Sequence, residues 1–175
     1  QIGIFAQSIG AGGGVASING TVNTQGAPSA AATQYGTGGT VNINVQGNII
    51  DNGQQGGTVG IFAQSQGNAT AQGAQNIVIT LGQSSNTNTQ NIIGYVQANT
   101  GIIVSGGSNG SNGTNEVILN VGSRLIVPQG NNAIVSIDGT TNVTNSGTIA
   151  GNVNLVPAAN SNAKAGSITN TTSGI

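Results

Sequence analysis

Apolar and polar residues alternate along several short stretches of the chain. In residues 41–45, Val41, Ile43 and Val45 fall on one side, and Asn42 and Asn44 fall on the other. Alternation with a period of two is typical of a half-buried β-strand, whose apolar side faces the core. The same pattern predicts three further sets of core side chains: Ile77, Ile79 and Leu81; Val117, Leu119 and Val121; Val153 and Leu155.

A second set of short β-branched stretches lies between these strands, at residues 48–50, 102–104, 125–127 and 148–149. Gly, Asn or Ser separates most of them from the preceding strand, and these residues suit tight turns. No stretch shows the apolar period of a helix. The pattern therefore predicts an all-β fold with two to three short strands in each turn of a triangular coil. It leaves open whether Phe5 and Phe62, in the two Gly-Ile-Phe-Ala stretches, face inward or outward.

The hexapeptide Gly-Ile-Phe-Ala-Gln-Ser occurs at residues 3–8 and again at residues 60–65, which is 57 positions later. Thr-Val-Asn at residues 21–23 recurs at residues 40–42, a step of 19 positions, and 57 is three times this step. Anchors that recur at about the same spacing can be followed to the end of the chain: Gly3, Val22, Val41, Gly60, Ile77, Gly94, Val117, Ile134, Val153 and Gly174.

A fixed period of roughly 20 residues is typical of a solenoid, in which stacked repeats share one core. The sequence predicts a single-stranded parallel β-helix (β-solenoid) of about 19 residues per coil over residues 1–175. Polar segments at residues 10–14, 24–39 and 105–115 interrupt the pattern and are expected to leave the stack as loops. Because both ends of such a stack are open strand edges, we interpret residues 1–175 as a segment of a longer repeat array.

The composition narrows the function classes. Charged residues make up 3% of the chain and the formal net charge is −1, so there is no basic patch for nucleic acid. No apolar run approaches the ~20 residues of a membrane helix, so this segment is not expected to insert into a membrane. Cys is absent, which rules out disulfides and thiolate metal sites. The 35% content of hydrophobic residues, clustered into β-branched runs, argues against general disorder.

Two longer motifs resemble a known family. They are Gly-Ile-Phe-Ala-Gln-Ser-Ile-Gly at residues 3–10, followed by a Gly cluster, and Thr-Asn-Ser-Gly-Thr-Ile-Ala-Gly-Asn-Val at residues 144–153. Both resemble repeats in autotransporter passenger domains of Gram-negative bacteria, and the period of the chain is similar to that of filamentous-haemagglutinin-like exoproteins. The resemblance implies a right-handed parallel β-helix that is exported across two membranes. It also implies display at the bacterial cell surface, in association with the outer membrane, or release to the exterior.

Candidate catalytic residues are few. Residues 106–110 match the nucleophile-elbow pattern around Ser108, but that motif needs a strand–turn–helix context and a His base, and the chain has no His. The acidic residues are Asp51, Glu116 and Asp138. A glycosidase needs two carboxylates within about 5–10 Å, and the predicted alignment of coils brings no pair together. Arg124 is expected to face solvent rather than to clamp a substrate. We therefore predict no catalytic, cofactor-binding or metal-binding residues and no cofactor.

The leading hypothesis is a structural and adhesive surface protein that is not an enzyme, a stiff and nearly uncharged β-solenoid segment of a secreted exoprotein or filament. Its expected partners are other copies of itself in fibres, and glycans or host or abiotic surfaces. Two alternatives remain: a biofilm-matrix fibre subunit that stacks end to end, and a polysaccharide-active enzyme on the same fold. An ice-binding solenoid needs flat Thr ladders, and the ladder that Thr21 and Thr40 would begin is not continued at the other positions before the anchors.

Overall fold

The structure is a computed structural model that describes residues 1–9, 16–19, 39–51, 57–66, 76–83, 93–106, 114–156 and 164–175. Across these ranges the chain forms fifteen β-strands and no helix, and every recorded strand pair is parallel. The same ranges contain no helix with the length and apolar character that crossing a membrane requires. The all-β fold predicted from the alternating pattern is confirmed.

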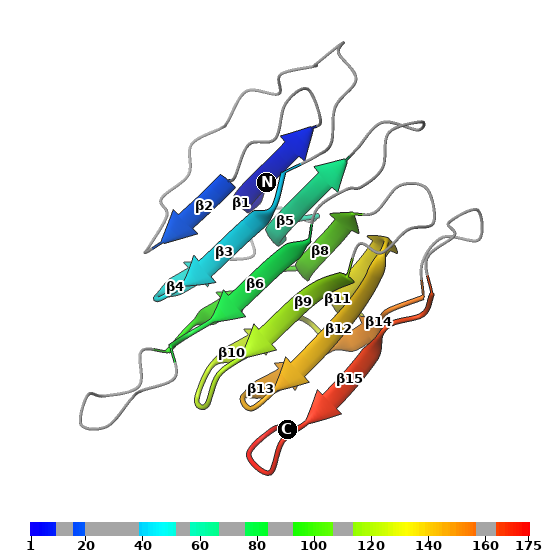
Figure 1. Cartoon of the computed structure of the whole chain (residues 1–175). Helices are drawn as coiled ribbons and strands as arrows, with labels where there is room; N and C mark the ends of the chain where they lie inside the picture. Colours follow the sequence, from blue (N-terminus) through cyan, green and yellow to red (C-terminus); the bar gives the residue numbers. More distant parts are fainter. Residues whose placement is uncertain are drawn as a thin grey trace.

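The described strands form three sheets, which we name A, B and C (Figure 1). Sheet A contains, in order of pairing, β1 (Ile2–Ile9), β5 (Val59–Gln66), β8 (Thr100–Gly106), β11 (Asn132–Asp138) and β14 (Asn152–Asn154). Sheet B contains β2 (Ala16–Asn19), β3 (Val41–Val45), β6 (Ile77–Leu81), β9 (Thr114–Leu119), β12 (Thr140–Asn145) and β15 (Ser167–Asn170). Sheet C contains β4 (Asn48–Ile50), β7 (Tyr95–Gln97), β10 (Arg124–Ile126) and β13 (Thr148–Ala150).

The chain visits the sheets in a fixed order. From β3 onward it passes through sheet B, sheet C and sheet A, and it then returns to sheet B one strand further along. Each strand consequently stacks on the corresponding strand of the preceding turn, as Figure 1 shows for β3, β6, β9 and β12. Three parallel sheets visited in this order are consistent with a β-helix or β-solenoid.

The repeats predicted that paired strands lie about 19 residues apart along the chain. This prediction is wrong for most of the described strand pairs. Along sheet A, the register aligns Ile4, Ile61, Ile102, Ile134 and Val153, whose sequence numbers differ by 57, 41, 32 and 19 in turn. In sheet C the sequence numbers rise by 47, 29 and 24 from Ile49 to Val96, Leu125 and Ile149. The connecting segments vary in length, because a loop adds little free energy cost as it grows. The anchors that fall in described strands consequently belong to two sheets: Gly3, Gly60, Ile134 and Val153 to sheet A, and Val41, Ile77 and Val117 to sheet B.

The separation of 57 residues between the two copies of the hexapeptide corresponds to one step between neighbouring strands of sheet A and not to three turns of 19 residues. Residues 3–8 of β1 and residues 60–65 of β5 lie side by side, with Phe5 opposite Phe62 and Gln7 opposite Gln64. The two copies are therefore immediate neighbours in sheet A. Thr-Val-Asn behaves differently: Val41 pairs with Ala16, and Val22 lies outside the described residues.

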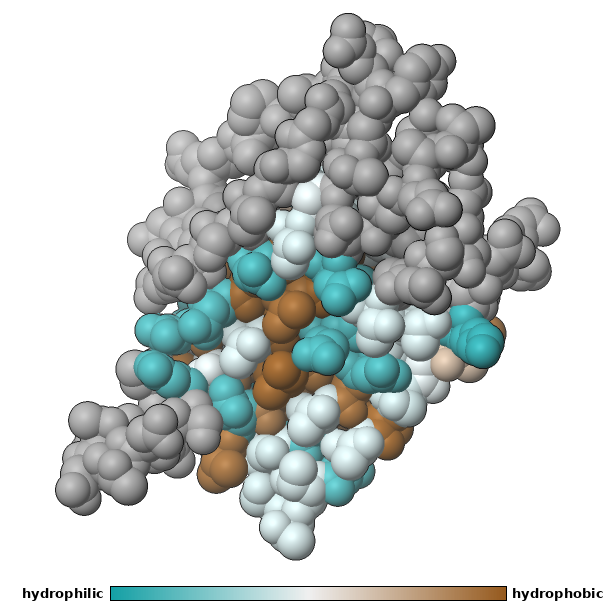
Figure 2. All heavy atoms as spheres, in the orientation of Figure 1, coloured by the Kyte–Doolittle hydropathy of each residue, from teal (hydrophilic) through white to brown (hydrophobic). Residues whose placement is uncertain are grey.

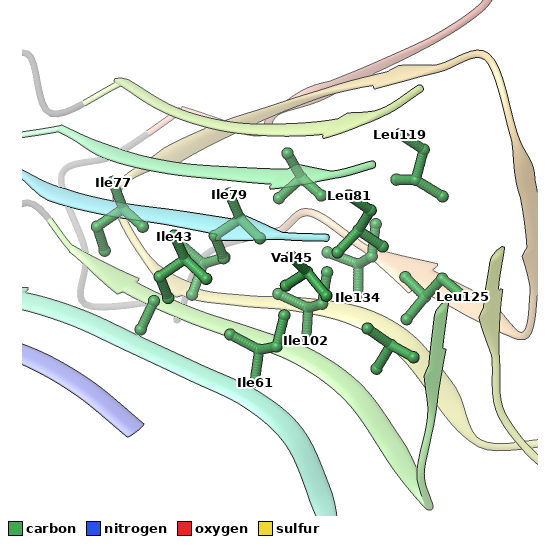
Figure 3. Close-up of a cluster of buried hydrophobic side chains, with 14 of the residues drawn as sticks. Ile43, Val45, Ile61, Ile77, Ile79, Leu81, Ile102, Leu119, Leu125 and Ile134 are labelled. Atoms are coloured by element: carbon green, nitrogen blue, oxygen red, sulfur yellow. The ribbon is translucent and has the colours of Figure 1, made fainter. Parts of the chain in front are cut away.

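The interior is filled by aliphatic side chains from all three sheets. Figure 3 shows Ile61 and Ile102 from sheet A, Ile79 from sheet B and Leu125 from sheet C directed into one cluster. Each of these four side chains has an exposed fraction of 0%. Stacking of the strands excludes water from these side chains, because each inward side chain lies beside the inward side chain of the next strand in register.

Most of the predicted core positions are confirmed. The side chains at positions 41, 43 and 45 of β3 and positions 77, 79 and 81 of β6 are buried, as the alternation requires. Val117 and Leu119 are buried as well, but the prediction for Val121 is wrong because this side chain is 51% exposed. β9 ends at Leu119, and the chain then turns at Gly122, whose φ of 82° belongs to the left-handed region that favours glycine.

The second set of predicted strands is present as β4, β10, β13 and part of β8. Of the three predicted loops, residues 10–14 lie outside the described residues, as does most of each of the other two. The ends of the loop predicted at residues 105–115 are strand instead, since Ser105 belongs to β8 and Asn115 to β9.

Two glycines explain why β5 and β8 each bury two consecutive residues, Gly60 with Ile61 and Gly101 with Ile102. A Cβ on Gly60 would lie 2.5 Å from Val96 Cγ1 and 2.7 Å from the carbonyl oxygen of Gly101. A Cβ on Gly101 would lie 2.4 Å from the carbonyl oxygen of Ala133 and 2.6 Å from Leu125 Cδ1. Without a Cβ, the chain can bend into sheet A with both Gly60 and the following isoleucine buried.

Polar side chains are also buried, where sheet A passes into sheet B. Asn115 accepts a hydrogen bond from the Ile77 backbone N–H at 3.2 Å, and its Nδ2 lies 3.4 Å from Thr141 Oγ1. The hydroxyl of Thr141 is in turn 2.9 Å from that of Ser136, which donates to the Gly139 carbonyl at 3.1 Å. These bonds satisfy backbone groups at a corner where the strand ladder is interrupted, which avoids the cost of burying them unpaired.

Candidate functional site

The three carboxylates lie on different elements. Asp51 follows β4, and its carboxylate accepts a hydrogen bond from the Thr58 hydroxyl. Glu116 is exposed on the outer side of β9 in sheet B. Asp138 is the last residue of β11 in sheet A, and its side chain lies outside the described part of the structure. The backbone thus assigns each acid to a different place around the coil.

The remaining candidates are placed as follows. Ser108 lies outside the described residues, so the structure does not test that position. Arg124 is the first residue of β10 and is exposed, as predicted. Within the described ranges, no group of three or more His, Cys, Asp or Glu side chains could hold a metal ion.

One polar cluster connects sheet C to sheet A. The buried Thr58 hydroxyl contacts Asp51 Oδ2 and lies 2.9 Å from Asn99 Oδ1, and Thr58 Oγ1 accepts a hydrogen bond from the Asn99 backbone N–H at 3.1 Å. Asp51 and Thr58 come from one turn of the chain and Asn99 from the next. The cluster therefore ties two successive turns together at this corner.

The outer face of sheet B is a regular array of short side chains. Neighbouring strands of a sheet are about 4.8 Å apart, and alternate residues of one strand are about 6.6 Å apart on the same face. Figure 2 shows hydrophilic and apolar side chains interspersed on this side of the molecule. One outward row is Asn42, Val78, Glu116, Asn142 and Ser167, and the next is Asn44, Thr80, Ile118, Thr144 and Thr169. Nine of these ten side chains are uncharged.

The outer face of sheet A carries an apolar row. Phe5 and Phe62 stack with ring centroids 5.4 Å apart and an angle of 13° between the ring planes, and their half-buried side chains point away from the core. The register continues this row with Ile103 and Val135. Beside it, Gln7 Nε2 donates a hydrogen bond to Gln64 Oε1. The structure thus answers the question that the alternation left open: both phenylalanines face outward.

The outer face of sheet C differs from the other two because it combines an aromatic ring with a guanidinium group. Tyr95 lies opposite Arg124 on neighbouring strands, and both point outward while Val96 and Leu125, the next residues along, are fully buried. The Tyr95 hydroxyl donates to Gln97 Oε1 at 2.5 Å. Sequence reasoning missed this pair. The two residues are far apart along the chain, and only the register of β7 with β10 brings them together.

Comparisons with known proteins give no guide to the function: no family model, no curated protein and no solved structure matches the chain.

Proposed function

We propose that the chain is a segment of a right-handed, single-stranded β-solenoid with a structural and adhesive role in an extracellular or bacterial surface protein. The right hand is the one that crossover connections between parallel strands adopt in nearly all proteins. The proposal includes export and association with the outer membrane, because the motifs at residues 3–10 and 144–153 resemble repeats of exported passenger domains. The proposed role requires no catalysis.

The observation that carries the adhesive role is the outer face of sheet B. Of the ten side chains in its two rows, seven are neutral and polar, two are apolar and one is acidic, and the rows repeat at a fixed spacing along the stacking direction. Asn142 and Ser167 are linked within a row by a hydrogen bond of 2.9 Å, so part of the array is pre-ordered. A surface that is ordered before contact loses little conformational entropy on binding. It can therefore make many weak hydrogen bonds to a polar surface such as a neutral glycan.

Adhesion can be measured with beads that carry the purified chain in flow over a film of cellulose, a neutral polysaccharide. We expect more beads to be retained than control beads that carry an unrelated protein. Thr144→Glu adds a second negative charge to the outer face of sheet B, on the strand next to that of Glu116, and should lower retention several-fold. Asn132→Glu places the same charge at the exposed start of β11 in sheet A and should leave retention unchanged. Retention equal to that of the control beads, or equal loss in both variants, would contradict the proposal.

A second role, the fibre subunit, is favoured by the environment of β15. Val143 on β12 and Ile168 on β15 occupy the same inward row, but they are 1% and 47% exposed. A half-covered row of this kind can accept a further strand, and in a fibre subunit another copy would supply it. Electron microscopy of the purified chain tests this role: long fibres with an axial repeat of ~4.8 Å are expected for a fibre subunit. Isolated short rods with that repeat would leave the adhesive segment as the role.

A further inference from the structure

The outer face of sheet C consists of two rows, at positions given by the register of four described strands. The first row is Asn48, Tyr95, Arg124 and Thr148, and the second is Ile50, Gln97, Ile126 and Ala150. At about 4.8 Å per strand, the face extends roughly 14 Å along the stacking direction. These two rows form one elongated surface, which we call the lane, and its shape suits an extended polymer better than a compact ligand.

The single charge in this lane is positive. None of the eight positions is acidic, and the register partners of Arg124 are Tyr95 and Thr148. Asp51 lies two strands away, beyond the far end of β4, and its carboxylate is engaged by Thr58. A guanidinium group presents a planar fork of donors that matches a carboxylate bidentately. The lane is thus complementary to an anion that carries a planar carboxylate.

The groups beside Arg124 suit a sugar. The Tyr95 hydroxyl reaches Gln97 on its own strand, so the tyrosine ring extends along β7, and the register makes Tyr95 the partner of Arg124 on β10. The tyrosine oxygen can still accept a hydrogen bond, and the amides of Asn48 and Gln97 can both donate and accept. An aromatic ring next to amide groups provides an apolar contact together with hydroxyl partners, which are the two kinds of surface that a sugar ring presents.

We propose that the outer face of sheet C binds acidic polysaccharides, with Arg124 pairing with the carboxylate of a uronic acid and Tyr95 packing against the sugar ring. This inference goes beyond the proposed function, because it assigns a second class of glycan to a different sheet. One exposed ion pair contributes little, so affinity for a single sugar is low. Binding becomes measurable when many copies of the chain, held on one surface, engage many carboxylates of one polymer.

The test passes alginate, a polymer of uronic acids, over a sensor surface that carries the chain at high density, at low salt and neutral pH. We expect the chain to bind alginate, to bind neutral dextran much less, and to lose alginate binding as salt rises, because screening weakens exposed ion pairs. Arg124→Gln should weaken alginate binding by about three- to fivefold, the loss expected for one exposed ion pair. Lys164→Gln is the matched control, because it removes the other basic residue of the chain and should leave binding unchanged.

Two further variants separate the contributions within the site. Arg124→Lys keeps the charge but loses the bidentate fork, so it should fall between the wild type and Arg124→Gln. Tyr95→Leu should weaken binding to alginate but not the weak charge-dependent binding to polyglutamate. Circular dichroism confirms that each outward-facing variant is folded before its binding is compared.

Several results would overturn the inference. Equal losses for Arg124→Gln and Lys164→Gln would show that net charge alone is responsible, and unchanged binding in Arg124→Gln would remove the site. Polyglutamate binding as strong as alginate binding, with no effect of Tyr95→Leu, would indicate an acidic peptide surface instead. The cellulose assay tests sheet B independently, because beads that carry Arg124→Gln should still be retained on cellulose. Loss of the alginate site would therefore leave the adhesive role of sheet B intact.

Discussion

Neighbouring residues of the same strands form two apolar rows of sheet A in very different surroundings. The inner row consists of Ile4, Ile61, Ile102 and Ile134, whose side chains are 0% to 1% exposed. The outer row consists of Phe5, Phe62, Ile103 and Val135, which are only half-buried. Both rows have the same register and similar hydrophobicity. The comparison shows that stacking in register does not by itself create a core, because only the inner row is enclosed by two other sheets.

The largest difference in stability between the two rows is expected when one isoleucine of β8 is shortened in the inner row and one in the outer row. Ile102→Ala removes a fully buried side chain and should lower the free energy of unfolding by about 2–5 kcal/mol, since a cavity remains. Ile103→Ala makes the same chemical change one residue later on the outer face and should cost about 1 kcal/mol or less. Urea unfolding followed by circular dichroism measures both values. Equal losses would show that the inner and outer rows are equivalent.

A smaller effect tests how the inner row is formed. Gly101→Ala forces a Cβ to within 2.4 Å of the Ala133 carbonyl oxygen, and overpacking of this kind typically costs about 1–3 kcal/mol. Thr100→Ala, at the preceding outward position, is the control and should change the free energy of unfolding by less than about 0.5 kcal/mol. Thermal unfolding curves of the two variants provide the measurement. An unperturbed Gly101→Ala would mean that the two turns are less closely packed than described.

The smallest effect concerns the outer row itself. A double-mutant cycle of Phe5→Leu and Phe62→Leu isolates the stacking of the two rings from the apolar area that each ring covers. The coupling free energy should be about 0.5–1.5 kcal/mol, the range for aromatic pairs. Additive single substitutions in the same urea experiment would show that the pair contributes only through area, like Ile103 and Val135.

The local structure followed from the sequence wherever alternation was strict. In residues 41–45 and 77–81, every apolar residue of the alternating set is buried, because side chains in a strand point alternately to opposite faces. The same reasoning placed Val121 in the core incorrectly, since the pattern does not show where a strand ends. In residues 60–63, glycine places two consecutive positions inside, and alternation alone could not orient Phe62.

The candidate sites were less accessible to sequence reasoning. The sequence showed that Arg124 and Tyr95 exist and are rare, but not that they are neighbours. Their meeting depends on the register between β7 and β10, which the uniform spacing predicted from the repeats does not reproduce. The nearly uncharged outer face of sheet B followed more readily, because the outward Asn and Thr residues belong to the same alternating stretches that define the core.

The sequence by itself determined that the chain is built from short β-strands, which residues face the core in the alternating strands, and that few charges reach the surface. These properties depend on side-chain chemistry and on the twofold alternation of a strand. Only the tertiary structure decided which strands are neighbours and which outward residues share a face. The physical reason is that an inserted loop changes the spacing along the chain at little cost in free energy, while register is fixed by packing of inward side chains between turns.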